Sequence, residues 1–414
     1  MKILFVHSAY QQLGGEDVAF AQERELVERG GHQVVSYCRS NDEASSYTHL
    51  GKPRLLKQVV WATDTRREVA GLLIRERPDL VHVHNTFLMI SPSIYYACRD
   101  AQVPVVQTLH NYRVLCPAAS FFRAGKVCEE CTHHGLRQSV RYGCYRNSRA
   151  ETAGVALMLA FHRGVETWTR MVDCYIALSE FARNKFVEGG LPRERVMVKP
   201  NFVPAIRGKD EGRGEYALFV GRLSAEKGLR TLIAAWTRLR QPIPLILVGD
   251  GPLRTELSVE VQRHGLSGIN FRGRLPRDQT LELMSGARFL VLPSECYENF
   301  PVSIAEAFSC STPVICSRLG ALEEIVENGR TGLHVIPADP QDLADKVEWA
   351  WQQPSRMQTM GLEARTEYEA KYTPERNYQL LMAIYEHTLT GYAQGHSRTE
   401  ATPDTCRCPV SLQR

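Results

Sequence analysis

The feature that most constrains the fold of this chain is an alternation of short apolar runs with amphipathic stretches, which occurs twice along its 414 residues. In the first half, an apolar run at residues 3–7 precedes a helical pattern over Val18–Arg29. Strands that alternate with helices form a parallel sheet covered by helices on both faces. The strands expected in the first half are Ile3–His7, His32–Tyr37, Leu80–His84, Val103–Thr108, Cys174–Leu178 and Val196–Lys199. We therefore predict an α/β domain that binds its ligands at the carboxyl ends of these strands.

A second domain of the same kind is expected after a linker. Lys199–Glu215 is rich in Pro, Gly and charged residues and lacks periodicity, which is typical of a linker. A helical pattern then covers Thr231–Leu239. The strands expected in the second half are Tyr216–Val220, Leu245–Val248, Gly268–Phe271, Arg288–Leu292 and Pro313–Cys316. We place the domains at residues 1–200 and 201–372, with a cleft between them as a natural ligand site.

Composition limits the location and partners of the chain. Its hydrophobic content of 43% is that of a globular protein, and no window reaches the length of a membrane span. The N-terminus MKILFVHSAY lacks the features of a signal peptide, so we expect a cytoplasmic protein whose cysteines are thiols or metal ligands. The net charge is +4, with the excess of basic residues in the first half. That excess suggests an anionic surface or acceptor near the N-terminal domain, or only a solvated basic face.

The stretch Ser294–Pro313 carries two acidic residues near the start of a short apolar helix. Glu298 lies in the loop before the helix and Glu306 lies among its apolar residues. Pro301 suits the first helical turn, so the backbone N–H groups of Asn299–Ser303 are free to bind hydroxyls or a phosphate. A buried carboxylate is costly unless it is hydrogen-bonded. Either one extended polar ligand contacts both glutamates, or one caps the helix and the other pairs with an arginine.

Three further loops at strand ends hold candidate ligand-binding residues. Gly14 and Gly15 let the backbone approach a phosphate or sugar, although such a pair is usually just a turn and does not form a dinucleotide fingerprint. His110 follows a strand and either points into the crevice or bonds a nearby carbonyl. Arg222 and Lys227 either neutralise a diphosphate together or lie in solvent.

Together these motifs resemble the family-four retaining glycosyltransferases of the GT-B fold. The resemblance is carried by an E-x7-E motif within YENFP…AEAF…TPV, by a T-x-H motif at residues 108–110, by the Gly-Gly loop, and by a GR-x4-KG element at residues 221–228. It covers residues 1 to about 390. It implies two Rossmann-like domains facing across a cleft, with a C-terminal helix at residues 373–390 that crosses back to the N-terminal domain.

The resemblance also implies roles for individual residues. Glu298 and the N–H groups of Asn299 and Phe300 would hold hydroxyls of a donor sugar, and Glu306 would bind the ribose. The residues expected to act in catalysis are His110, Arg222, Lys227 and Glu298. The residues expected to bind the donor are Gly14, Gly15, Arg222, Lys227, Gly251, Arg272, Ser294, Glu298, Asn299, Phe300, Pro301 and Glu306.

Residues 112–165 form a cysteine-rich insert in the N-terminal domain, which we expect to be rich in loops. Its four cysteines are Cys116, Cys128, Cys131 and Cys144. The central C-x2-C pair has the spacing with which two thiolates hold one zinc ion, and the outer cysteines can complete a closed structural site. The alternatives are four unrelated buried thiols, or a site in which His133 or His134 replaces one ligand.

A basic segment follows the cysteines and precedes the apolar stretch Ala153–Phe161. Its arginines are Arg137, Arg141, Arg146 and Arg149. Basic residues beside a short apolar helix can hold a protein on an anionic membrane leaflet. The alternative is a core helix flanked by solvated arginines. The polar tail 391–414 is expected to be disordered.

We therefore predict a retaining glycosyltransferase with metal-independent catalysis. It would transfer a hexose-type sugar from a nucleotide diphosphate sugar to a glycan or lipid-linked acceptor in cell-surface polysaccharide synthesis. The expected location is the cytoplasm, at the inner face of the membrane, and no nucleic-acid partner is expected. Two alternatives remain: a nucleotide-sugar epimerase on the same fold, and a zinc-stabilised binding protein without activity.

Overall fold

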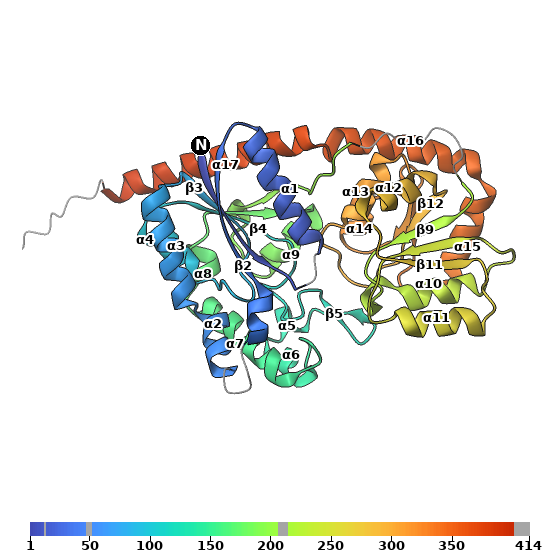
Figure 1. The fold of residues 1–414 in the computed structure, drawn as a ribbon, viewed down its shortest axis with the longest axis horizontal. Helices are drawn as coiled ribbons and strands as arrows, with labels where there is room; N and C mark the ends of the chain where they lie inside the picture. Colours follow the sequence, from blue (N-terminus) through green and yellow to red (C-terminus); the bar gives the residue numbers. More distant parts are fainter. Residues whose placement is uncertain (12–13, 47–51, 206–213, 401–414) are drawn as a thin grey trace, which may run out of the picture.

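The computed structural model describes residues 1–11, 14–46, 52–205 and 214–400, which form two α/β domains bridged by a long C-terminal helix (Figure 1). The predicted fold, two Rossmann-like domains in the GT-B arrangement, is confirmed. No helix of the described part is long and apolar enough to span a membrane.

The N-terminal domain is built on a six-stranded parallel sheet with the order β2-β1-β3-β4-β7-β8. Its strands are β1 (Lys2–Ala9), β2 (Gln33–Ser40), β3 (Leu80–Asn85), β4 (Val105–Thr108), β7 (Cys174–Ala177) and β8 (Val196–Val198). All six strands lie where the sequence predicts them, with ends that differ by up to three residues. The strand order reverses between β1 and β3, and in open α/β sheets such a switch point is where ligands bind.

Helices cover both faces of this sheet. The helices of the N-terminal domain are α1 (Gly15–Arg29), α2 (Lys52–Val60), α3 (Thr63–Glu76), α4 (Ile94–Asp100), α5 (Glu130–His133), α6 (Arg137–Tyr142), α7 (Arg149–Gly164), α8 (Thr167–Arg170) and α9 (Glu180–Glu188). Residues of α3, α4, α7 and α9 share one hydrophobic cluster with the sheet. On the other face, α1 and the C-terminal helix α17 (Pro374–Glu400) pack against β1 and β3.

The C-terminal domain repeats this architecture with the strand order β11-β10-β9-β12-β13-β14. Its strands are β9 (Ala217–Val220), β10 (Leu245–Val248), β11 (Ile269–Gly273), β12 (Phe289–Leu292), β13 (Val314–Ser317) and β14 (Gly332–Val335). Its helices are α10 (Leu229–Trp236), α11 (Arg254–Arg263), α12 (Arg277–Gly286), α13 (Val302–Ser309), α14 (Ala321–Ile325), α15 (Pro340–Gln352) and α16 (Pro354–Lys371). The sequence analysis missed β14, a four-residue strand that begins with a glycine and shows no alternation.

The C-terminal helix crosses back to the N-terminal domain, but it is longer than predicted. Helix α17 runs from Pro374 to Glu400, so the prediction of a disordered tail from residue 391 is wrong for residues 391–400. The side chains of Leu381 and Tyr385 are fully buried against the first sheet and anchor the middle of this helix. Residues 401–414 of the predicted tail, and residues 206–213 of the predicted linker, lie outside the described part of the chain.

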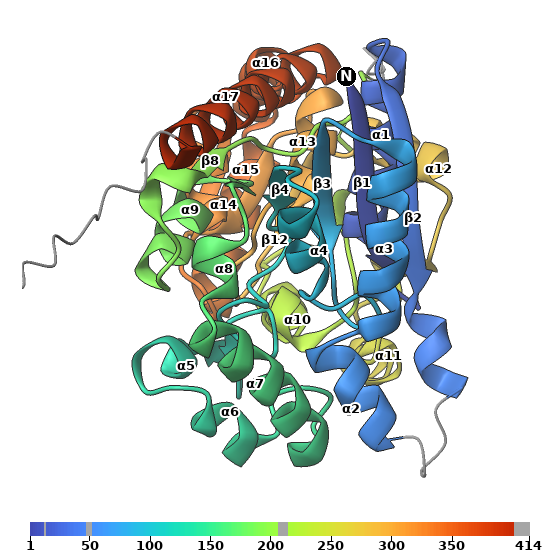
Figure 2. The ribbon, with the colours of Figure 1, turned by 90° about the vertical axis from the view of Figure 1, so that its left-hand side faces the viewer.

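The cysteine-rich insert is more helical than predicted. Between β4 and β7 the chain forms a short antiparallel hairpin of β5 (Phe122–Arg123) and β6 (Lys126–Val127), followed by α5, α6 and α7. Helix α7 includes the whole apolar stretch at residues 153–161 and begins at an N-cap, Ser148, whose side chain accepts a hydrogen bond from the Glu151 N–H. In Figure 2 these helices lie with α2 at the foot of the N-terminal domain.

Candidate functional site

Three of the predicted donor-binding residues form one hydrogen-bonded group in the C-terminal domain. Lys227 Nζ lies 2.5 Å from Glu298 Oε1, and the Ser294 hydroxyl donates to the same oxygen at 2.7 Å. Burial lowers the pKa of Lys227, but the Glu298 carboxylate outweighs this and raises the pKa above its ordinary value. Among the described residues, Glu298 Oε2 has no hydrogen-bond partner. This oxygen is therefore available to a ligand hydroxyl.

Glycines bring the two loops of this group together. Gly228, which follows Lys227, has a φ of 69°, and a Cβ there would lie 1.8 Å from the Pro293 carbonyl oxygen. A side chain at this position would push the Lys227 loop away from the Glu298 loop. Gly251 has a similar role on the next loop, because its Cβ would lie 2.4 Å from the Leu223 carbonyl oxygen. The predicted turn thus packs directly on the loop that carries Arg222.

Glu306 is half-buried on α13 and pairs with Arg277 at the start of α12. Arg277 Nε lies 3.2 Å from Glu306 Oε1. Burial raises the pKa of Glu306, and Arg277 opposes the shift. Of the alternatives left open by the sequence, the structure contains the pairing with an arginine. Among the described residues, the side-chain partners of Glu298 are Lys227 and Ser294, whereas that of Glu306 is Arg277.

The remaining predicted donor residues differ in exposure. Arg222 and Arg272 are exposed at the ends of β9 and β11. Pro301 is the N-cap of α13 rather than its first helical residue, because its ψ of 106° is extended. Phe300 is buried and packs edge-on against Tyr372, with ring centroids 5.5 Å apart. Its side chain belongs to the core, which leaves only its backbone for a ligand.

The two glycines of the loop after β1 differ in their surroundings: the Gly14 N–H is hydrogen-bonded within the protein, and Gly15 has open space around it. The Gly14 N–H donates to Asp17 Oδ2 at 2.8 Å, which is one half of a capping box at the start of α1. A Cβ on Gly15 would meet no atom within 4 Å. Packing within the protein therefore does not require a glycine at position 15, although access for a ligand would.

The loop that carries Glu298 also holds the two domains together. The Asn299 side chain donates to the Leu109 carbonyl oxygen at 2.5 Å, and the Asn299 carbonyl accepts from the Ser179 hydroxyl at 3.3 Å. The Tyr112 hydroxyl donates to the Glu298 carbonyl oxygen at 3.4 Å. Leu109 immediately precedes His110, so these contacts place the two groups of predicted site residues on neighbouring loops.

His110 is held from within the N-terminal domain by a second histidine. His110 Nε2 lies 2.9 Å from His84 Nδ1, and the two rings are stacked. Burial lowers the pKa of both histidines well below the ordinary value, with the neighbouring histidines adding to the shift. Both rings are therefore neutral near pH 7. With Nε2 taken by His84, the Nδ1 atom of His110 is the one left to contact a ligand.

A buried charged pair lies behind these histidines. Lys199 Nζ is 2.6 Å from Glu23 Oε2 and 3.2 Å from Asn377 Oδ1 on α17, and Glu23 Oε1 is 3.7 Å from His84 Nε2. In the described part of the chain, Glu23, His82 and His84 are the one group of three potential metal ligands with atoms within 4.8 Å. Lys199 already neutralises Glu23 there, so the cluster needs no ion. The sequence analysis did not single out Glu23 or Lys199.

Glu16 is a half-buried acidic residue that the sequence analysis did not single out. Its Oε2 accepts hydrogen bonds from the Tyr10 hydroxyl at 3.0 Å and from Asn111 Nδ2 at 3.1 Å. Its Oε1 is buried and has no partner among the described residues. Burial raises the pKa of Glu16 to about 7. The available signal was its position directly after Gly14-Gly15, at the switch point of the sheet.

A pocket that is partly open to solvent lies beside His110. Its polar wall includes His110, Asn111 and Arg113, and its apolar wall includes Met158 and Leu159 of α7. The cysteine-rich insert therefore contributes directly to the surroundings of the predicted site.

The four cysteines of the insert are free thiols. Cys116 and Cys131 are buried, and Cys128 and Cys144 are half-buried. Burial raises the pKa of Cys131 to about 11, and the other three thiols add to the shift, so the four are electrostatic neighbours. None of them belongs to the group of three ligands within 4.8 Å described above. A zinc site here stays a prediction.

Two family models match the sequence in succession. Residues 14–207 match "Glycosyltransferase Family 4" and residues 205–367 match "Glycosyl transferases group 1". The chain is a family-four glycosyltransferase. Both models meet at the linker, so each describes one domain of this glycosyltransferase.

Characterised relatives and solved structures agree with this assignment. Glycogen synthase of Mycobacterium tuberculosis is 29% identical over 341 residues, which cover 76% of this chain and 74% of that protein. O-antigen chain mannosyltransferase C of Escherichia coli is 28% identical over 172 residues, 41% of this chain and 46% of that protein. HepE of Anabaena in complex with UDP has a TM-score of 0.67 at 20% identity, covering 94% of this chain and 100% of that one. Sucrose-phosphate synthase of Thermosynechococcus elongatus has a TM-score of 0.68 at 20% identity, covering 96% and 99%.

Proposed function

We propose that this glycosyltransferase moves a hexose-type sugar, with retention of configuration, from a nucleotide diphosphate sugar to a glycan or lipid-linked acceptor. We place the reaction in cell-surface polysaccharide synthesis, in the cytoplasm. The relative named as an O-antigen chain mannosyltransferase and the fold neighbour solved with UDP support this choice.

The single observation that carries the proposal is the group of Lys227, Ser294 and Glu298. Two donors fix Glu298 Oε1, while its Oε2 has no hydrogen-bond partner in the part of the chain that the structure describes. A carboxylate oriented in this way suits a hydroxyl of the donor sugar. Lys227 beside it, with exposed Arg222 on the same loop, supplies positive charge for the diphosphate. As the sugar leaves, negative charge grows on that diphosphate, and fixed cations stabilise it.

The chemical step we propose is a front-side substitution. The bond from the sugar's anomeric carbon to the diphosphate oxygen breaks, and a bond to the acceptor oxygen forms on the same face. The acceptor hydroxyl gives its proton to the leaving phosphate oxygen, so no protein nucleophile and no metal ion is needed. His110, neutral and fixed by His84, orients the donor rather than acting as a base.

A thermal-shift panel of nucleotides and nucleotide sugars tests the donor. A ligand that binds only the folded state raises Tm by mass action. We expect one nucleoside diphosphate and its sugar conjugate to raise Tm, starting with UDP and UDP-glucose, and Lys227→Met to remove the shift. No shift with any nucleotide, together with firmly bound zinc, would instead support a binding protein without activity. Interconversion of donor isomers without an acceptor would support an epimerase.

We also propose that Cys116, Cys128, Cys131 and Cys144 hold a structural zinc ion. The support is that all four free thiols lie in one insert and that the other three raise the pKa of Cys131. Metal analysis of the purified protein should give one zinc per chain, lost in Cys128→Ser/Cys131→Ser. Cys174→Ser, at a buried cysteine outside the insert, is the matched control. A metal-free but folded wild-type protein would contradict this proposal.

A further inference from the structure

One end of the N-terminal domain combines exposed apolar side chains with exposed cations. Of the twelve large apolar side chains exposed among the described residues, five lie on or next to α2, α6 and α7. These five are Leu56, Tyr142, Leu157, Phe161 and Val165. The other seven are scattered over both domains, which is normal for a protein surface. We call the end formed by α2, α6 and α7 the foot of the domain.

The foot is one continuous surface because α7 packs against both α2 and α6. The close fit of α7 to α2 shows at Gly154, where a Cβ would lie 3.2 Å from Leu56 Cδ1. All three helices lie together at the base of the domain in both views (Figures 1 and 2).

Helix α7 is apolar on its outer side as well as its inner side. Its inner side buries Val155, Met158 and Leu159. On its outer side, Leu157 is 51% exposed and Phe161 is 40% exposed. The outer positions between and beside them, Ala153, Ala160 and Gly164, carry no polar group either. Over residues 153–161 the helix is apolar on all sides, and a helical segment of this kind is usually buried, whereas here its outer side is exposed.

The charge around this apolar strip is mainly positive, and exposed Glu166, next to Val165, is paired with Arg170. The exposed cations of the foot are Arg54, Lys57, Arg137, Arg141, Arg146 and Arg149. The three helices contain a single acidic residue, Glu151, which lies 3.8 Å from Arg146. Tyr142, 52% exposed, has the Arg123 guanidinium 3.8 Å from its ring centroid. Aromatic and aliphatic side chains among arginines suit the boundary between anionic headgroups and acyl chains.

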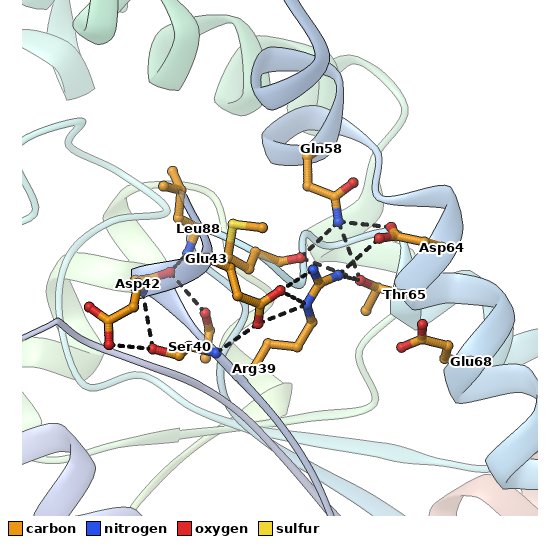
Figure 3. Close-up of polar contacts among 12 residues, drawn as sticks. Arg39, Ser40, Asp42, Glu43, Gln58, Asp64, Thr65, Glu68 and Leu88 are labelled. Carbon is orange, nitrogen blue, oxygen red and sulfur yellow. Dashed lines mark hydrogen bonds and ion pairs between the residues drawn. The ribbon is translucent and has the colours of Figure 1, made fainter. Parts of the chain in front are cut away.

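Helix α2 is fixed to the domain by buried polar contacts, so the foot is a formed surface. Gln58 of α2 donates to Asp64 Oδ1 at 2.8 Å and to the Met89 carbonyl oxygen at 3.1 Å. Arg39, at the end of β2, donates to Oδ2 of the same Asp64 carboxylate at 3.0 Å. It also donates to the Thr65 hydroxyl at 2.9 Å (Figure 3). These bonds tie α2 to the sheet and to the start of α3.

We propose that the foot docks on an anionic phospholipid surface, with Leu157 and Phe161 entering the acyl boundary and the arginines contacting headgroups. The inner side of the same helix supplies Met158 and Leu159 to the pocket beside His110. Docking therefore brings the membrane to the helix that borders the site. The delivery of a lipid-linked acceptor by this route rests on the proposed function, whereas vesicle binding itself does not.

Vesicle co-sedimentation without any donor tests the docking. We expect the wild-type protein to sediment with vesicles of equal parts phosphatidylcholine and phosphatidylglycerol and to stay in solution with phosphatidylcholine alone. Leu157→Glu/Phe161→Glu should lower the binding constant more than tenfold. Arg141→Glu/Arg149→Glu should lower it and weaken its salt dependence. Val259→Glu/Leu362→Glu, at exposed apolar positions of the C-terminal domain, is the matched control and should bind as wild type does.

Each contrary result overturns the proposal. Failure of the wild-type protein to bind anionic vesicles excludes a lipid partner, as does equal binding by Leu157→Glu/Phe161→Glu. A dimer in lipid-free solution that this variant abolishes would assign the foot to a second copy of the chain. Nucleotide binding in the thermal-shift panel is measured separately, so failure of the membrane proposal and failure of the proposed function are distinguishable.

Discussion

At the scale of single residues, the donor side of the site depends on a carboxylate with one oxygen fixed and one free. Glu298→Gln keeps the shape but removes the charge that Lys227 and Ser294 hold in place. Hydrogen bonds to charged groups contribute about 1.5–3 kcal/mol, so kcat/KM for the donor should fall roughly 10- to 150-fold. Steady-state kinetics measure this. Glu295→Gln is the control, since Glu295 lies in the same loop as Glu298 but accepts a hydrogen bond from Thr231 of α10. A change of less than twofold in Glu298→Gln would contradict the assigned role.

Glu16 provides a second prediction, on the pH dependence of stability. Burial raises its pKa from 4.5 to about 7, so between these values the folded state binds a proton that the unfolded state releases. Stability from this group is therefore present at low pH, is lost as the pH rises through this window, and stays lost above it. Glu16→Gln removes the effect, on the order of 1–3 kcal/mol.

Thermal unfolding at about pH 5 and about pH 8 checks the sign, because the pH slope of stability follows proton uptake. The Tm of Glu16→Gln relative to wild type should rise with pH. Glu28→Gln, at an exposed position on the same helix, should show no such trend. A constant difference between Glu16→Gln and wild type would mean that the carboxyl titrates in its ordinary range.

Sequence alone located the residues of the site whose spacing forms a pattern. Lys227, Ser294 and Glu298 were predicted, and the structure brings them into contact. The partners of His110 could not be predicted, because His84 lies on another strand. Glu23, which contacts His84, could not be predicted either, because it lies in the middle of α1, an ordinary amphipathic helix. Their contacts depend on strand order and register, which no local pattern encodes.

At the scale of elements, the position of the loop after β9 depends on Gly228, which packs directly against the Pro293 carbonyl oxygen. Gly228→Ala places a Cβ against the Pro293 carbonyl and should displace Lys227. We expect donor affinity to fall about tenfold or more, measured by calorimetry. Gly265→Ala has a similar positive φ of 64° but open space around it, and is the matched control. Both substitutions cost about 1–2 kcal/mol of backbone strain, so equal donor affinities would refute the positioning role.

The first turn of α17 packs on a buried charged pair, Lys199 and Glu23, through Asn377. Lys199→Met leaves Glu23 buried without its cation, which should cost about 3–5 kcal/mol of stability. Glu23→Gln/Lys199→Met should recover most of that loss, because no net charge then remains buried. Urea unfolding of the single and double variants measures both effects. A double variant as unstable as Lys199→Met would show that the pair is not the cause.

Elements with their own periodicity were predicted well. The strands other than β14, and helices α1 and α10, stand close to their expected positions, since local apolar patterns identify them. The end of α17 was misplaced because residues 391–400 are polar and contain glycines, which argues for a coil. Strand β14 is only four residues long and owes its place to pairing with β13. A tertiary contact therefore decides the position of β14.

At the scale of the whole molecule, the two domains meet through the loop that carries the proposed donor carboxylate. Asn299→Ala removes the hydrogen bond to the Leu109 carbonyl and should shift the domains toward a more open arrangement. Small-angle scattering should give a larger radius of gyration for the variant without ligand, and a smaller difference once UDP is bound. Asn201→Ala, at a buried asparagine after β8, is the control. Identical scattering profiles would show that closure does not need this bond.

The path of α17 also affects how this enzyme can be recombined with its relatives. Because its buried segment belongs to the core beneath β1 and β3, exchanging donor specificity by swapping halves at the linker alone would graft a foreign helix onto the native sheet. A viable hybrid needs a second junction near residues 372–374, so that residues 374–400 travel with the first half of the chain. Gene shuffling at one crossover should therefore yield mostly insoluble products, and shuffling at two should not.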